Sequence, residues 1–419
     1  MSNRPVVIDL FSGCGGMSLG LEAAGFDIAA SVEIDPIHSL VHHYNFPYGA
    51  TICQDISQVS SQDLLNAIKT KGFSPNIDVI AGSPPCQGYS YMGRRAINDP
   101  RNQLVFEFAR IVAEIRPKYF IFENVPGLNS GKHQKFLEKL IKHFEKNHYS
   151  IVKPIKILDA SGYGAPQKRK RLILIGYRND VTPPSYPAAT HGHNKKLLPF
   201  TTVSCAISDL SKIPVFIGQD YGISADLLDY SGFRTSFNVQ PQGEYALCHK
   251  RSNNKIVWGH RGSKHTETSI QRFANTIPGN LDKVSRFLKL SPNGLCNTLR
   301  AGTASNKGAF TAPRPIHYEI PRCISIREAS RLHVFPDWFQ FHRTIWHGFR
   351  EIGNAVVPLL SKSLGTEIIK CLNIDLSTLE IRNLELIDDS LLSYNMRQAS
   401  EFWQVPHDVI PKRQRVKMP

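Results

Sequence analysis

Three stretches of the sequence carry side chains that could do covalent or acid–base chemistry. In the first, "GSPPCQGYS" (82–90), Cys86 stands between two prolines and a glycine, directly after the apolar run 77–81. A thiolate held in such a shaped loop is a nucleophile. A buried cysteine that packs as a small apolar residue fits the same letters, so Cys86 needs independent support.

The second stretch places a carboxylate at the end of an apolar run. Glu123 begins "ENV" (123–125), directly after the strand-like run 118–122. A carboxylate at a buried strand end should be paired with a cation or have a perturbed pKa, and such a group can act as a general acid. From this stretch alone, a core glutamate whose charge is satisfied remains the alternative.

The third stretch, "APQKRKRLILIG" (165–176), alternates Gln167, Arg169 and Arg171 with two lysines. In an extended chain these three side chains project on one side and the lysines on the other. A charge run usually lies in solvent, but this one leads straight into an apolar strand. We therefore predict that an arginine of this run points inward.

A glycine turn, "DLFSGCGGMSLG" (9–20), joins a strand pattern to a helix pattern. Counted from Gly13 it is not a strict GxGxxG motif, because Ser18 occupies the sixth position. Such a turn can bring the backbone close to an adenosine-type cofactor, with Glu33 at the next strand end binding the ribose hydroxyls. Asp55, after a third strand pattern, could contact the adenine amino group. A tight turn without a ligand and a solvated Asp55 are the alternatives.

The elements that must position these groups follow from hydrophobic periodicity. Up to about residue 180, strand-like apolar runs alternate with helical patterns, which predicts an α/β fold with a parallel sheet covered by helices on both faces. Cys86 and Glu123 follow the carboxyl ends of two of these runs, where open α/β folds bind ligands. A helix is predicted over 103–115, ending before Pro117. The strand-like runs include 5–11, 27–34, 77–82 and 118–125.

Length and composition limit the class of protein. A chain of 419 residues exceeds what one hydrophobic core usually serves, so two lobes are expected. The 50 Lys and Arg exceed the 35 Asp and Glu by a net charge of +15, which favours a nucleic acid partner over a membrane surface. No apolar run approaches a spanning helix and the N-terminus enters a strand at once, which predicts an intracellular protein. The 8 cysteines form no CxxC pair, so neither a zinc site nor a disulfide framework is indicated.

After residue 180 the pattern becomes irregular. The stretch 181–200 is rich in Pro, His and Gly, which is typical of a linker into a less regular lobe. Within that lobe, "HKRSNNKIVWGHRGSKHTET" (249–268) combines basic, amide and hydroxyl side chains, the groups that contact phosphates and base edges. A mobile polar loop is the alternative. Helical patterns return at 325–335 and 355–372, and the chain ends on the basic "PKRQRVKMP".

The ordered set "DLFSGCGG", "EID", "QDI", "PPCQGYS", "ENV", "QKRKR", "IREASRL" and "GNAVVP" resembles the DNA (cytosine-5)-methyltransferases of prokaryotic restriction–modification systems. The resemblance covers the chain from residue 5 to about 372, except for the insert 181–290. Tyr89 stands where the family more often has phenylalanine, and His333 where it often has glutamine. Neither departure removes a reacting group, so the resemblance implies an active enzyme.

The resemblance implies a Rossmann-like methyltransferase fold with a second, smaller, irregular target-recognition lobe. It implies methyl transfer from S-adenosylmethionine to carbon 5 of a cytosine flipped out of duplex DNA. By motif match, Cys86 adds to carbon 6 and Glu123 faces nitrogen 3 and the exocyclic amine. Arg171 would hold the carbonyl oxygen of the base, and Arg169 would lower the thiol pKa or bind phosphate.

The same motif match assigns binding residues. S-adenosylmethionine is the implied cofactor, S-adenosylhomocysteine the product, and no metal is implied. Gln87 and Ser90 are predicted DNA contacts in the cysteine motif. Arg251 and Arg261 are also predicted DNA contacts, but from the basic stretch 249–268, which the motif match does not cover. The predicted cofactor contacts are Phe11, Gly13, Gly15, Glu33, Ile34, Asp55, Ile56, Pro85, Leu104, Asn354 and Ala355.

These assignments predict a discontinuous organisation. The catalytic and cofactor-binding lobe is 1–180, the target-recognition lobe 181–320, the return segment 321–375, and the C-terminal extension 376–419. The last helix must then fold back beside the first strand.

The expected partner is double-stranded DNA, and no membrane partner is expected. We expect the protein to bind DNA as a monomer at the nucleoid of a prokaryotic cytoplasm. A cognate restriction endonuclease would act on the same DNA independently. The rival predictions are a tRNA cytosine-5 methyltransferase, a non-catalytic DNA-binding protein on the same scaffold and, more distantly, a Rossmann dehydrogenase.

Overall fold

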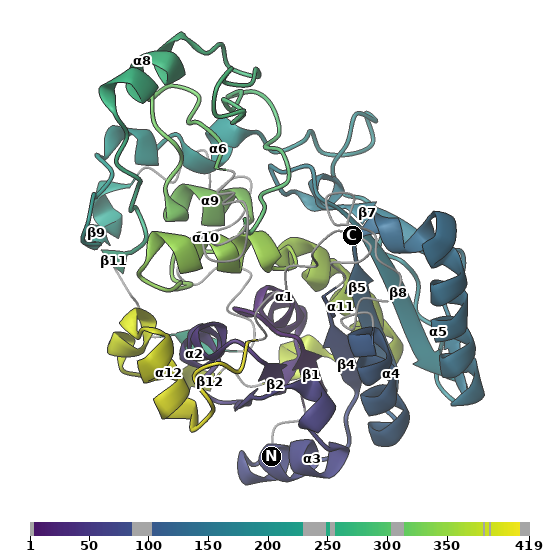
Figure 1. The fold of residues 1–419 in the computed structure, drawn as a ribbon. Coiled ribbons are helices and arrows are strands. Elements are labelled where there is room, and N and C mark those ends of the chain that lie inside the picture. The colour runs from purple at the N-terminus through teal and green to yellow at the C-terminus, as the bar shows by residue number, and fades with distance from the viewer. Residues whose placement is uncertain are drawn as a thin grey trace, which may run out of the picture.

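The computed structural model describes residues 4–85, 103–228, 249–251, 256–302, 314–379, 382–384 and 387–410. Within this part of the chain, the main sheet has the strand order β3-β2-β1-β4-β5-β8-β6, and β7 pairs with β8 (Figure 1). The strands are β1 Val6–Leu10, β2 Asp27–Glu33, β3 Ala50–Cys53, β4 Val79–Gly82, β5 Tyr119–Asn124, β6 Tyr149–Ile151, β7 Lys156–Asp159 and β8 Lys170–Arg178.

The first five strands pair in parallel, which confirms the α/β prediction. Strand β8 runs antiparallel to β5, β6 and β7. No α-helix separates β6, β7 and β8, and antiparallel neighbours need only short connections. The sheet is therefore parallel-dominated, with an antiparallel edge that the alternating pattern did not predict.

Helices cover both faces of this sheet. Helix α4 matches the predicted helix over 103–115 and ends at Arg116, whose positive φ of 57° turns the chain before Pro117. One buried cluster joins the sheet to α3, α4 and α5, and a second joins it to α1 and the return segment. The helices of this layer are α1 Gly16–Ala24, α2 Pro36–Asn45, α3 Ser61–Thr70, α4 Leu104–Ile115 and α5 Gln134–Lys146.

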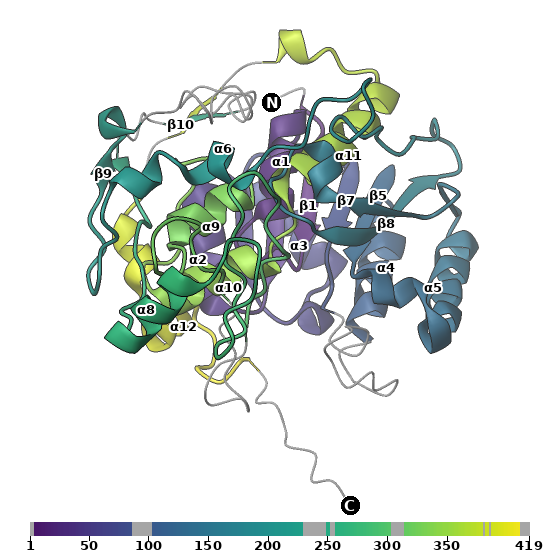
Figure 2. The same cartoon turned by 90° about the horizontal axis from the view of Figure 1, so that it is seen from above.

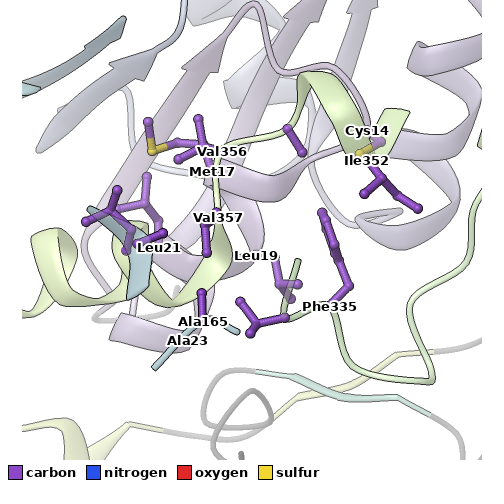
Figure 3. Packing of buried hydrophobic residues seen from close by; sticks show 14 of the residues in the cluster. Cys14, Met17, Leu19, Leu21, Ala23, Ala165, Phe335, Ile352, Val356 and Val357 are labelled. Atoms are coloured by element: carbon purple, nitrogen blue, oxygen red, sulfur yellow. The ribbon is translucent and has the colours of Figure 1, made fainter. Parts of the chain in front are cut away.

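The return segment folds back onto the start of the chain, as predicted, but its long helix packs along the first helix and not beside the first strand as expected. Helix α11 (Pro358–Leu372) packs along α1, and glycines allow the close approach. A Cβ at Gly20 would overlap Ser361, and one at Gly365 would lie 2.8 Å from the Ala24 Cβ. Figure 3 shows Met17 and Leu21 of α1 packed with Val356 and Val357, which precede α11.

The segment 181–320, which the sequence analysis predicts to be the recognition lobe, has short elements, as its irregular sequence predicts. They lie together at one end of the molecule, around α9 (Ile326–Leu332) (Figure 1). Arg331 of α9 forms ion pairs with Asp209 and, at 2.6 Å, with Asp337, so that a buried guanidinium is fully compensated. The lobe elements are α6 Val203–Ile207, β9 Ile223–Ser224, β11 Ile256–Val257 and α8 Glu267–Asn275.

The C-terminal extension, predicted over 376–419, returns to helix α2 near the start of the chain. Helix α12 (Met396–Trp403) lies beside α2 in both views (Figure 1 and Figure 2). Strand β12 (Arg382–Leu384) pairs in parallel with β10 (His249–Arg251) of the recognition lobe. In the described ranges, no helix combines the length and the apolar character needed to cross a membrane.

Candidate active site

An ion pair lies where β5 ends and β8 begins. Arg171 Nε and Glu123 Oε1 are 2.7 Å apart, and their side chains are 15% and 8% exposed. The pairing of Asn124 with Leu172 in the two strands brings the side chains together. The structure confirms both predictions made for these positions: the strand-end carboxylate is paired, and an arginine of the basic run points inward.

The nucleophile candidate Cys86 lies outside the described residues, as do Gln87 and Ser90. The chain that leads to Cys86 is described up to Pro85, and it leaves β4 beside β5. Asn124 Nδ2 donates to the carbonyl of Pro84 at 3.2 Å. The start of the cysteine loop is therefore fastened next to the Glu123–Arg171 pair. Sequence reasoning missed this role of Asn124, although the residue stood in the motif.

Arg169 is fully enclosed, in contrast to Arg171. Its side chain is 2% exposed, and its two Nη atoms donate to the carbonyls of Leu299, Gly353 and Ala355 at 2.9 Å each. The guanidinium thus joins β8 to two distant segments. This placement favours a structural role for Arg169 over the predicted phosphate contact, because its Nη donors already bind protein carbonyls.

Gln167 and His333 form a second set of hydrogen bonds that connects the chain before β8 to the return segment. Gln167 Nε2 lies 3.1 Å from His333 Nδ1, and His333 Nε2 lies 3.0 Å from the carbonyl of Ala355. A carbonyl only accepts, so the network assigns the proton to Nε2, and Nδ1 accepts from Gln167. Burial and the charge of Arg169 hold the pKa of His333 well below its usual range. The departure at His333 therefore has a structural explanation.

We expect Arg169→Met to lower the free energy of unfolding by about 3 kcal/mol or more, because three buried carbonyls lose their donor. Denaturant unfolding measures the change. The matched control is Lys170→Met at the exposed neighbouring position, where a change within about 0.5 kcal/mol is expected. Equal effects of the two substitutions would contradict the structural role of the Arg169 hydrogen bonds.

The glycine turn and Glu33 are brought together as predicted. Gly13 N donates to Glu33 Oε2 at 2.9 Å, and Asp35 N donates to Oε1 at 2.9 Å. Phe11 and Gly13 have φ of 59° and 54°, and Gly15 has φ of 103°. A Cβ built at Gly13 meets no heavy atom of the described chain within 4 Å, whereas one at Gly15 would lie 2.5 Å from the Phe46 ring. The turn is thus packed on one side and open at Gly13.

Glu33 has the electrostatic character of a functional carboxylate. Burial, together with the charge of Asp35, raises the pKa of Glu33 to about 7. The backbone N–H groups of Asp35 and Gly13 favour the ionised form and limit the rise. A carboxylate with a raised pKa beside an open turn is a candidate ligand contact.

The remaining cofactor candidates follow the carboxyl ends of the parallel strands, begin helix α4 (Leu104) or lie in the return segment. Asp55 Oδ1 caps the short helix Ile56–Gln58 by accepting from Ser57 N at 3.0 Å, so the turn role considered for it is present. A Cβ at Gly16 would lie 3.0 Å from the Ala355 Cβ, which places the "GNAVVP" segment against the glycine turn. Ile34, Asp55, Pro85 and Leu104 are half-buried, Ile56 and Ala355 are buried, and Asn354 is exposed.

The two described arginines predicted to contact DNA have protein partners close by. Arg261 Nη1 donates to the carbonyl of Arg343 at 2.6 Å, which ties it to the return segment. Arg251 belongs to β10, which pairs with β12; its side chain lies outside the described part. For Arg261 this contact favours a structural role, because one of its Nη donors already binds a protein carbonyl. Among the described residues, no group of three or more His, Cys, Asp or Glu is placed to hold a metal ion.

Comparison with known proteins agrees with this geometry. The family model of C-5 cytosine-specific DNA methylases matches residues 6–370. The Type II methyltransferase M.XorII of Xanthomonas oryzae pv. oryzae is 44% identical over 416 residues, which cover 98% of this chain and 95% of that protein. M.DdeI of Desulfomicrobium norvegicum, also a Type II methyltransferase, is 31% identical and covers 92% of each chain.

Solved structures show the same fold. A crystal structure of a protein described as a DNA modification methyltransferase encoded within an E. coli prophage has a TM-score of 0.68 and 32% identity, covering 88% of this chain and 100% of that one. The S. pombe Dnmt2 methyltransferase has a TM-score of 0.53 at 17% identity over 88% of this chain and 100% of its own, a likeness of fold alone. The chain therefore belongs to the C-5 cytosine-specific DNA methylase family and is a DNA cytosine-5-methyltransferase.

Proposed function

We propose that this methyltransferase transfers a methyl group from S-adenosylmethionine to carbon 5 of a cytosine flipped out of duplex DNA, through a covalent adduct with Cys86. The observation that carries the proposal is the Glu123–Arg171 ion pair beside the start of the Cys86 loop. The paired parallel strands β4 and β5 bring both to the edge of the sheet at which α/β folds bind ligands.

The reaction needs a nucleophile because carbon 5 of cytosine is itself a poor one. The Cys86 thiolate forms a bond to carbon 6, while Glu123 gives a proton to nitrogen 3, and carbon 5 becomes enamine-like. S-adenosylmethionine, when bound, supplies an electrophilic methyl group. A water molecule then accepts the carbon 5 proton, the electrons of that C–H bond re-form the double bond between carbons 5 and 6, and the thiolate leaves carbon 6. The proton on nitrogen 3 returns to Glu123. Arg171 orients Glu123 and is placed to hold the base carbonyl oxygen.

The residues around the glycine turn fit an adenosine-type cofactor. Open space at Gly13 lets a ligand approach the backbone, and Glu33 presents a carboxylate to ribose hydroxyls from the end of β2. Pro85 and Leu104 supply half-buried apolar walls, and Asn354, at the expected methionine end, is exposed and precedes Ala355, which lies against the turn.

We expect Glu33→Gln to weaken binding of S-adenosylmethionine by about 10- to 100-fold, because a charged acceptor is lost. Isothermal titration calorimetry measures the change, and the affinity for DNA should stay the same. Since the pKa of Glu33 is raised to about 7, lowering the pH from about 8 to about 6 protonates the carboxyl and weakens binding of wild type. In Glu33→Gln this pH dependence should flatten; an unchanged pH profile would remove Glu33 from the cofactor site.

The biological setting is proposed from the relatives. Two of them are named Type II methyltransferases, so we infer that this chain is the modification enzyme of a restriction–modification system, acting on chromosomal DNA as a monomer beside a separate endonuclease. Bisulfite mapping of a plasmid from expressing cells should show one methylated cytosine context. Parallel incorporation of labelled methyl groups into duplex DNA and tRNA tests the rival: transfer to tRNA alone would overturn the proposal.

We further propose that 181–320 selects the DNA sequence, while chemistry resides in 1–180 and after 320. The described reacting and cofactor candidates lie in those two segments. Transplanting 181–320 into a related methyltransferase of different specificity should therefore change the methylated motif to that of this protein, with cofactor affinity unchanged. An unchanged motif in a folded, cofactor-binding chimera contradicts this division.

A further inference from the structure

Arg343 lies in the loop before α10 (Ile345–Asn354), where three parts of the chain meet. Its guanidinium carbon lies 4.1 Å from the centroid of the Trp258 ring, and its side chain is only 13% exposed. Stacking of a guanidinium on an indole is favourable and directional, because the planar cation lies over the negative face of the ring. An arginine so enclosed has a fixed position.

The recognition lobe holds Arg343 from one side. Arg343 Nη1 lies 3.9 Å from Asp220 Oδ2, and this oxygen also accepts from Gly259 N at 3.0 Å. The carbonyl of Arg343 accepts from Arg261 Nη1 at 2.6 Å. The side chain and the backbone of one residue thus contact three points within 220–261.

The C-terminal extension holds the same residue from the other side. Arg343 N donates to the carbonyl of Leu392 at 2.8 Å, and Nη2 donates to Asp389 Oδ2 at 3.3 Å. The preceding residue repeats the contact, since His342 Nε2 lies 3.0 Å from the carbonyl of Tyr394. The loop that carries Arg343 is therefore bound along its length to residues 389–394.

The extension is itself fixed to the catalytic lobe through α2. Trp403 Nε1 donates to the carbonyl of Pro36, the first residue of α2, at 3.1 Å. Leu391 and Ala399 are buried against Ile37 and Leu40 of the same helix. The family model matches residues 6–370, so this support comes from residues after the matched region.

We propose that Arg343 is a positioning residue that sets the recognition lobe over the catalytic lobe, with the C-terminal extension holding the Arg343 loop in place. The parallel pairing of β12 with β10 is a second link between extension and recognition lobe. The proposal rests on the proposed function only in taking 181–320 as the DNA-reading part. It predicts that loss of the guanidinium impairs the use of DNA and spares cofactor binding, because Glu33 and the glycine turn do not contact Arg343.

The test compares Arg343→Ala and Arg343→Lys in the full chain. Arg343→Ala should raise the Kd and the KM for duplex DNA at least about fivefold and leave the Kd for S-adenosylmethionine within about twofold. Arg343→Lys should restore part of the loss, because an ammonium keeps the charge near Asp220 but cannot stack as a planar fork on Trp258.

A second pair of variants isolates the contribution of the extension. Asp389→Ala should raise the KM for DNA by about two- to threefold, since the Arg343 backbone contact with Leu392 remains. Glu401→Gln is the matched control, because the Glu401 carboxylate is also exposed in the extension. Its Oε1 lies 2.8 Å from Arg397 Nε, and both residues belong to α12. No change in DNA use is expected for it.

Hydrogen–deuterium exchange supplies a readout that does not depend on methylation. In Arg343→Ala, exchange should rise in 256–262 and 387–394 and stay unchanged in 11–20. Such a pattern with an altered KM for DNA supports the proposal, even if the substrate proves to be another nucleic acid. The proposal is overturned if exchange rises throughout the chain with equal losses of cofactor and DNA affinity, or if local exchange rises while DNA use is unaltered.

Discussion

Cys86→Ser will methylate no DNA above background, while its affinity for S-adenosylmethionine stays within about threefold of wild type. A serine hydroxyl is hardly ionised near neutral pH and is a far weaker nucleophile than a thiolate, so addition to carbon 6 fails. Pro84 and Asn124, which fasten the start of the loop, are unchanged by the substitution, so the cofactor wall at Pro85 should persist. Transfer of labelled methyl groups and calorimetric titration measure the two quantities.

Cys371→Ser is the matched control, because Cys371 is a half-buried free thiol near the end of α11 and its Sγ contacts the carbonyl of Pro183, which is not a site residue. It should retain wild-type methylation. Substantial methylation by Cys86→Ser would exclude the covalent mechanism proposed here, whereas loss of both activity and cofactor binding would assign Cys86 a structural role in the loop.

Glu123→Gln is expected to lower kcat for DNA methylation by about 100-fold or more, the usual range for loss of a positioned general acid. The amide keeps the shape of the side chain but holds no transferable proton at the pH of the reaction. It also leaves Arg171 without the anion that lies 2.7 Å from its Nε. Steady-state kinetics with cognate duplex should show the loss in kcat, with little change in the Kd for cofactor.

Two comparisons sharpen this result. Glu138→Gln on α5 removes an exposed carboxylate of the catalytic lobe and should leave kcat unchanged. Arg171→Lys keeps a cation near Glu123 but loses the planar fork, so an intermediate kcat is expected. Wild-type turnover by Glu123→Gln would show that protonation of the base comes from another group.

Much of the architecture could be predicted from the sequence, because the relevant signals are local. Buried parallel strands read as short apolar runs, and α4 shows its apolar stripe and its end before Pro117 directly. The antiparallel strand β8 was predicted as a strand but not in its direction. Direction depends on which neighbour a strand finds, and residues 172–174 find their partners about fifty residues back in β5.

The partner of a side chain in the basic segment 249–268 could not be predicted from the sequence. Arg261 is a basic residue in a basic, polar stretch, which fits a phosphate contact. In the structure, however, its guanidinium donates to the carbonyl of Arg343. A residue type limits what a side chain can bind. Which acceptor it meets depends on how the lobes pack.

By itself, the sequence determined which groups could do chemistry and that strand ends would carry them. Cys86, Glu123 and Arg171 each stand at the end or the start of an apolar strand, and the two-residue period of β8 turned Arg171 inward and Lys170 outward. Only the tertiary structure decided that Arg169 binds the carbonyls of Leu299, Gly353 and Ala355 and that Arg343 contacts both Trp258 and Asp389. These contacts join residues that are dozens to hundreds of positions apart in the sequence. Local periodicity does not predict them, because it reports only on residues within one helix or strand.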